Sequence, residues 1–199
     1  MRWLTLYARS RRAPASLAAV LISAVAVGAL ARIGDGGPMD PRLSTLALAA
    51  GATALSAGLG GQDLALDRTA AIHWLPRRAA HVLLCGVLIG AVLLAVQMPI
   101  GGSAVASSTS SSSAAFVVRN SAGLMGLVAI GAAWCGGPYA WIPPFAWLAV
   151  SFVVPSTTDG VTQVLTWMLL PPGTTAGTWT ALVLAVVGTT VYAVGGPRR

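Results

Sequence analysis

The segment Ala79–Met98, AAHVLLCGVLIGAVLLAVQM, decides the fold class of this chain. It contains no Asp, Glu, Lys or Arg, and apolar residues fill almost all of its positions. An α-helix needs about 20 such residues to cross the hydrocarbon core of a bilayer. The segment therefore predicts a membrane-spanning helix and an integral membrane protein.

Five more apolar runs have a similar length. Only 9% of the 199 residues are charged and 56% are hydrophobic, whereas roughly a quarter of the residues of a soluble domain are charged. We therefore predict an all-α membrane protein, one domain over residues 1–199, built as a bundle of six transmembrane helices. The predicted spans are Pro14–Ala31, Leu43–Gly60, Ala79–Met98, Ala114–Cys135, Tyr139–Pro155 (kinked by Pro143 and Pro144) and Thr178–Val194.

The arginines orient this bundle. All 12 basic residues are Arg, and nine of them share one side of the membrane if both termini face the cytoplasm. Arg32, Arg42 and Arg119 then lie on the outside. The positive-inside rule favours this orientation. A cleaved signal peptide that ends near Ala31 is the alternative interpretation of the first apolar run.

Three segments outside the spans have a character of their own. Residues 1–13 alternate apolar residues with Arg, which predicts an interfacial helix at the inner face, with a disordered basic tail as the alternative. Residues 101–113 are rich in Ser and are expected to form a flexible external loop. Residues 155–177 are external and contain an apolar stretch, Val161–Leu170. That stretch is too short to span the membrane, so a re-entrant or interfacial element is expected.

The sequence lacks the residues that several kinds of functional site require. The chain has no Lys and therefore no GxxxxGK[ST] phosphate loop. Its five acids, all Asp, lie in the connections, whereas ion-coupled carriers usually bury an ionisable residue in a span. Only Cys85 and Cys135 are present, and we expect free thiols. We predict no catalytic, cofactor or metal site in this chain.

The largest cytoplasmic connection carries most of the functional argument. It includes residues 60–78, and its sequence over Gly60–Val82 is GGQDLALDRTAAIHWLPRRAAHV. Leu64, Ala71, Ile72 and Leu75 fall on one helix face, so the segment predicts a short amphipathic helix with polar groups on its other side. A plain interfacial helix that settles this connection on lipid is the alternative.

The layout resembles the permease subunit of a type-2 ABC exporter of the actinobacterial kind. The family's coupling segment is similar to Leu66–Thr69 (LDRT) followed by Trp74–Arg78 (WLPRR). Asp67 stands where Glu is common, and no Gly precedes Thr69. Arg119–Leu124 (RNSAGL) followed by Gly136–Pro138 (GGP) also looks like members of this family.

The resemblance implies a mechanism and partners. Two copies of the chain, or this chain and a related permease, would dock on a separate P-loop ATPase in the bacterial plasma membrane. ATP and Mg²⁺ would bind to that ATPase, and this chain would contact lipid and no nucleic acid. The expected cargo is a lipid, an antibiotic or a hydrophobic peptide. The implied ATPase-coupling residues are Asp63, Asp67, Arg68, Thr69, His73 and Trp74.

Arg119 is the expected substrate-pathway residue. Its charge moves the start of the fourth span toward Ser121, so that Arg119 lies at the outer boundary, where it would meet an anionic head group. The alternative is that its side chain snorkels to the outer headgroups. At the level of the whole chain, two further hypotheses stay open: a non-transporting membrane protein (a sensor, immunity protein or assembly partner), and a membrane enzyme or ion-coupled carrier.

Overall fold

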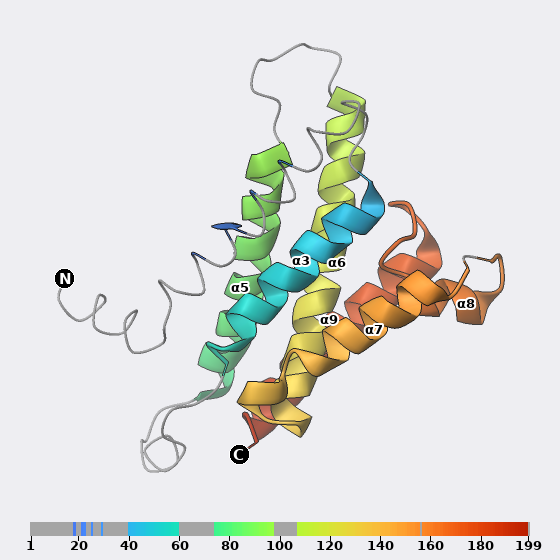
Figure 1. The fold of residues 1–199 in the computed structure, drawn as a ribbon. Coiled ribbons are helices and arrows are strands. Elements are labelled where there is room, and N and C mark those ends of the chain that lie inside the picture. The colour runs from blue at the N-terminus through green and yellow to red at the C-terminus, as the bar shows by residue number, and fades with distance from the viewer. Residues whose placement is uncertain are drawn as a thin grey trace.

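A computed structural model describes residues 40–59, 74–97, 107–155 and 157–198, together with the single residues 18, 21, 22, 25 and 29. Within these residues the regular structure is helical, which confirms the all-α part of the predicted fold class (Figure 1). The helices are α3 (Pro41–Ser56), α5 (Trp74–Gln97), α6 (Ser107–Trp134), α7 (Ile142–Val153), α8 (Gly160–Leu165) and α9 (Thr175–Gly195), with a 3₁₀ turn at Gly137–Tyr139.

Three helices are long and apolar enough to cross a membrane. They run over Leu75–Gln97, Ser113–Trp134 and Thr175–Gly195, close to the third, fourth and sixth predicted spans. The chain is therefore a membrane protein. Helices α3 and α7 have 16 and 12 residues, which correspond to about 24 and 18 Å. Both are shorter than the hydrocarbon core of about 30 Å, so the six-span count stays a prediction.

Helix α6 forms the centre of the bundle. It contacts α3, α5, α7 and α9, and its contact with α9 is the most extensive. Of its membrane span, 67% is buried inside the molecule, compared with 33% for α5 and 28% for α9. Helices α5 and α9 therefore present apolar side chains outward, as helices that face lipid or another apolar surface do.

Two glycines set the distance between α6 and α9. A Cβ placed on Gly188 would overlap the backbone carbonyl of Gly126, and a Cβ placed on Gly126 would overlap the carbonyl of Leu184. The two helix backbones are therefore in direct contact, which is the role of small residues in membrane helix pairs.

The two ends of the bundle differ in charge. At one end, which we call the arginine end, Arg77, Arg78 and Arg198 lie around the first turn of α5 and the C-terminus of α9. The backbone N–H of Arg198 donates to the carbonyl of Ala132 at 3.1 Å. The same end carries the exposed aromatic residues Trp134, Tyr139 and Trp141. Pro41, Gln97, Ser113 and Pro172 lie together at the other end, which we call the cavity end.

Two predicted boundaries were wrong. Pro143 and Pro144 occupy the first turn of α7 and do not kink a longer helix. In that turn the missing N–H of proline removes no intrahelical bond. Helix α6 begins at Ser107, inside the segment 101–113 that was expected to be a loop. The low helix propensity of Ser is a weak preference that the surrounding structure overrides. Residues 101–106, 1–13 and most of the first predicted span lie outside the described residues.

Candidate functional site

The segment Thr166–Thr174, which we call the connector, joins α8 to α9 and leaves regular helix. Trp167 and Met168 are fully buried (0% exposed) although they lie in this irregular stretch. The predicted re-entrant element, Val161–Leu170, comprises most of α8 and the first half of the connector. A short helix and a buried irregular segment therefore stand where a re-entrant element was expected.

The connector reaches deep along α6. A Cβ placed on Gly123 would overlap the ring of Trp167, so the indole lies directly on the α6 backbone. Gly123 is the midpoint of the Ser113–Trp134 span, about 15 Å from either end. Irregular backbone at such a depth is found where protein buries it or where it lines a cavity, because lipid offers no hydrogen bonds to its polar groups.

Arg119 supplies most of the hydrogen bonds that the connector receives. Its side chain is 9% exposed, and its nitrogens make five hydrogen bonds. Nη2 donates to the carbonyls of Leu170 at 2.7 Å and Trp167 at 3.2 Å. Nη1 donates to the carbonyl of Pro171 at 3.1 Å and to Thr174 Oγ1 at 3.4 Å. A guanidinium has five N–H groups, so the number of its donors equals the number of these hydrogen bonds.

The fifth bond ties Arg119 to its neighbour. Arg119 Nε donates to Asn120 Oδ1 at 3.1 Å, and Asn120 Nδ2 donates to the carbonyl of Met168 at 2.8 Å. Asn120 is fully buried. Thr45 Oγ1, from α3, donates to the same Met168 carbonyl at 3.3 Å. One pair of adjacent α6 residues therefore bonds five residues of the connector: Trp167, Met168, Leu170, Pro171 and Thr174.

The C-terminus of α8 is held in the same way by α7. Trp147 Nε1 and Ser151 Oγ both donate to the carbonyl of Leu165, at 3.1 and 2.7 Å. Side chains from α3, α6 and α7 thus satisfy five backbone carbonyls that lie between the spans. We call Arg119, Asn120, Thr45, Trp147 and Ser151 together the carbonyl clamp.

The clamp holds a positive charge without an acid. In the described part of the chain the acids are Asp40 and Asp159, and both are exposed outside the spans. The Arg119 charge is instead surrounded by carbonyl dipoles, and its Cζ lies 5.4 Å from the centre of the Phe116 ring, a cation–π distance. Because its donors are all in use, Arg119 is placed to anchor the connector. An anionic head group would have to displace connector carbonyls to reach it.

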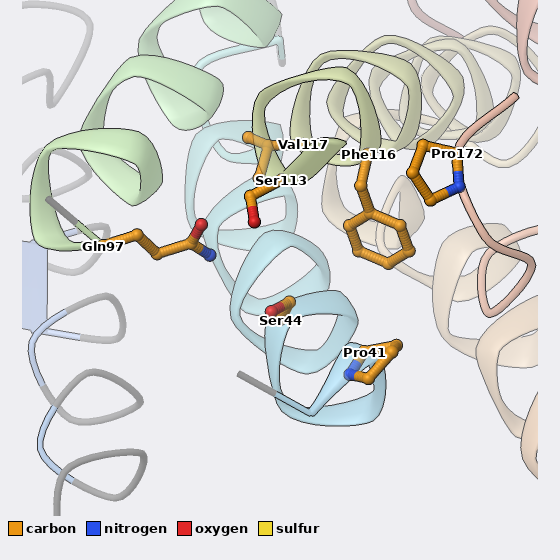
Figure 2. Close-up of a pocket in the computed structure, with 7 residues that line it drawn as sticks. All are labelled: Pro41, Ser44, Gln97, Ser113, Phe116, Val117 and Pro172. Atoms are coloured by element: carbon orange, nitrogen blue, oxygen red, sulfur yellow. The ribbon is translucent and has the colours of Figure 1, made fainter. Parts of the chain in front are cut away.

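A small cavity opens beside the clamp at the cavity end (Figure 2). Its volume is about 130 Å³, and Phe116, which contacts Arg119, is part of its wall. Pro172 of the connector lies next to Phe116 in this wall, and Gln97 of α5 lies opposite them (Figure 2). Sites for drug-sized ligands occupy about 300–1,000 Å³, so this cavity alone does not hold a cargo of that size. The remaining lining residues are Pro41, Ser44, Ser113 and Val117.

The predicted ATPase-coupling residues lie almost entirely outside the described residues. Asp63, Asp67, Arg68, Thr69 and His73 belong to residues 60–73, which the structure does not describe, and Trp74 is the first residue of α5. The structure does describe the residues on either side of this connection. Leu59 precedes it and α5 follows it, both at the arginine end.

Sequence reasoning selected Arg119 and missed the other four members of the clamp. The available signal was the presence of polar side chains inside otherwise apolar runs, since such residues usually face the bundle interior and find partners there. In the described ranges no three metal-binding side chains come together. No protein-family model, curated protein or solved structure matches this chain.

Proposed function

We propose that this chain is the permease subunit of an ATP-driven exporter of the ABC-2 type, powered by a separate P-loop ATPase. The observation that carries the proposal is the connector, an irregular segment whose Trp167 ring lies against Gly123 at mid-depth of the α6 span. Side chains of α3 and α6 bond the carbonyls of this segment. Interrupted helices and re-entrant segments of this kind are characteristic of transporters and channels, because their backbone is built to line or close a pathway.

The distribution of charge supports an external energy source. Ion-coupled carriers place an acid or His at the depth where the ion binds. Within the described ranges, the acids lie outside the spans, and the one charge at depth, Arg119, is used by the connector. A subunit that receives its energy from ATP hydrolysis by a partner needs no such group.

The arginine end is proposed to face the cytoplasm. Arg77, Arg78 and Arg198 lie there, with exposed Trp134, Tyr139 and Trp141. Arg residues mark the cytoplasmic side, and Trp and Tyr mark the interface. The described residues on either side of the connection 60–73, Leu59 and Trp74, lie at this end, where an ATPase in the cytoplasm would reach the connection.

A second copy of the chain is proposed to complete the transporter. The exposed faces of α5 and α9 are apolar, with Leu84, Val87, Leu182 and Val186 each at least half exposed. One of these faces would contact lipid and the other the partner copy. The cargo class that suits such walls is hydrophobic or amphipathic: a lipid, an antibiotic or a peptide.

Affinity purification of the tagged chain from its native membrane, followed by mass spectrometry, tests the proposal. A P-loop ATPase is expected to co-purify with the wild type and to be lost from the Asp67→Ala/Arg68→Ala variant. The matched control is Asp159→Ala/Arg42→Ala, which removes the same two charges from two exposed positions outside the connection 60–73 and should retain the ATPase. If no ATPase accompanies the wild type in detergents that preserve membrane complexes, the proposal is wrong and a non-transporting membrane protein takes its place.

A further inference from the structure

Both flanks of the connection 60–73 are held by one element, the C-terminal end of α9. On the N-terminal flank, Tyr192 Oη donates to the carbonyl of Leu59 at 2.8 Å. The bond is buried and joins residues 133 positions apart. Leu59 is itself fully buried. The chain therefore enters the connection from a fixed point on α9.

On the other flank, Arg78 packs against the backbone just after α9. Gly196 has φ +68°, and a Cβ placed on it would lie 2.7 Å from Arg78 Nη1 and 3.0 Å from Arg78 Cζ. The backbone conformation at this position favours glycine, and a side chain here would also have to displace the end of the Arg78 side chain. Gly196 and Pro197 are buried, so the tail is packed into the bundle.

The same tail is tied to the central helix. The N–H of Arg198 donates to the carbonyl of Ala132 in the last turn of α6, at 3.1 Å. The free C-terminal carbonyls of a helix need partners, and here the tail supplies one. Residues Tyr192–Arg198, which we call the C-terminal latch, thus contact the end of α3, the start of α5 and the end of α6.

Helix α9 connects this latch to the carbonyl clamp. Its middle is in backbone contact with α6 at Gly188 and Gly126. We therefore expect a shift of one helix to displace the other. Its first turn lies against the clamp, because a Cβ on Gly177 would be 3.0 Å from Arg119 Nη1. A displacement of α9 at the arginine end therefore acts on the residue that holds the connector.

We propose that the C-terminal latch is the element through which a displacement of Leu59 and Arg78 moves the α6–α9 pair, with Tyr192 and Gly196 as its positioning residues. This inference rests on the proposed function, because an ATPase would supply the displacement. Packed helices that shift as rigid units are a known way to carry such a change across a membrane protein. Contacts between the latch and the clamp do not by themselves show that movement passes between them. The evidence needed is a variant that still binds the ATPase but loses the movement.

The test uses the complex of the chain with its co-purifying ATPase in lipid nanodiscs. Cys135 is exposed, three residues after Ala132, and Cys85 is buried, so Cys135 serves as a native reporter beside the latch. Its rate of maleimide labelling is measured with and without ATP, Mg²⁺ and vanadate, which trap the ATPase. Tyr192→Phe removes only the hydroxyl that bonds Leu59, and the control Tyr139→Phe makes the same change at an exposed tyrosine of the arginine end.

In the wild type and in Tyr139→Phe, trapping is expected to change the labelling rate of Cys135. In Tyr192→Phe the ATPase should still bind, while the trapping-dependent change falls by about threefold to tenfold, the effect of one buried hydrogen bond on an equilibrium. Gly196→Ala, which pushes a methyl group into the Arg78 guanidinium, should give the same loss of response and serves as a second variant.

Each other outcome overturns the inference in a distinct way. If the Tyr192→Phe and Gly196→Ala complexes respond like the wild type, the latch does not transmit movement, and the proposed function is unaffected. If both variants lose the ATPase, the latch only shapes the docking surface. If the wild type binds no ATPase, the proposed function fails and the inference fails with it.

Discussion

Arg119→Leu is expected to release the connector, because it removes the guanidinium that satisfies most of the connector's carbonyls. The carbonyls of Trp167 and Leu170 accept a side-chain hydrogen bond from Arg119, whereas that of Pro171 also accepts from Thr174 Oγ1. Truncation therefore leaves the carbonyls of Trp167 and Leu170 without this donor. They are bonded by Arg119, which lies about 9 Å inside the span, where lipid cannot replace the donor.

The magnitude follows from the number of bonds. Four hydrogen bonds join Arg119 to the connector. Interhelical hydrogen bonds in membrane proteins average about 0.6 kcal/mol each, and a buried group left unsatisfied costs about 1–3 kcal/mol. The first value gives about 2 kcal/mol for four bonds, and the second gives about 2–6 kcal/mol for two carbonyls, so the expected loss of unfolding free energy for Arg119→Leu is about 2–6 kcal/mol. Arg119→Lys keeps the charge but loses the planar fork, so it should lie between Arg119→Leu and the wild type.

The assay is reversible unfolding of the purified chain in mixed micelles with increasing SDS, followed by tryptophan fluorescence. Arg42→Leu is the matched control, because Arg42 is exposed at the cavity end, and its loss of unfolding free energy should stay below about 0.5 kcal/mol. If Arg119→Leu and Arg42→Leu unfold alike, Arg119 does not anchor the connector and the account of the carbonyl clamp is refuted.

Three further predictions concern packing and access. Gly188→Ala should lower the unfolding free energy by about 1–3 kcal/mol in the same SDS assay, because its methyl group meets the Gly126 carbonyl. The control is Gly160→Ala, whose methyl group meets nothing within 4 Å. Equal losses in the two variants would contradict the α6–α9 contact. Gly123→Ala should displace the Trp167 ring and shift the fluorescence of a variant that keeps Trp167 as its sole tryptophan; an unchanged spectrum would contradict the depth assigned to the connector. In the folded chain a maleimide should label Cys135 and spare Cys85, which is 8% exposed; labelling of both thiols at equal rates would contradict the burial of the α5 face that carries Cys85.

The long spans could be predicted from the sequence because hydrophobic length alone determines them. The apolar runs at Ala79–Met98 and Thr178–Val194 correspond closely to α5 and α9. The boundaries of two helices were predicted wrongly because local composition did not determine where they begin. The Ser-rich start of α6 is helical, and the Pro143–Pro144 pair begins α7 and does not bend a longer span.

The clamp was harder to predict, because its partners are backbone atoms. Arg119 stood out as a charge in an apolar run, and the sequence alone favoured a boundary position near substrate or headgroups. Three of the acceptors of its hydrogen bonds are backbone carbonyls 48 to 52 residues away in the chain, and no side chain marks them in the sequence. Gly123 and Gly177 gave no signal either, since their role is to leave room for Trp167 and for Arg119.

Native mass spectrometry of the complex extracted from its membrane tests the central claim most directly. The account predicts an assembly of two copies of this 20.1 kDa chain, or one copy with a related permease, and two P-loop ATPase chains. Addition of Mg²⁺-ATP and vanadate should add trapped nucleotide to the ATPase chains alone. A chain that is released intact from the membrane without any ATPase, as a monomer or in a complex with other proteins, would contradict the account.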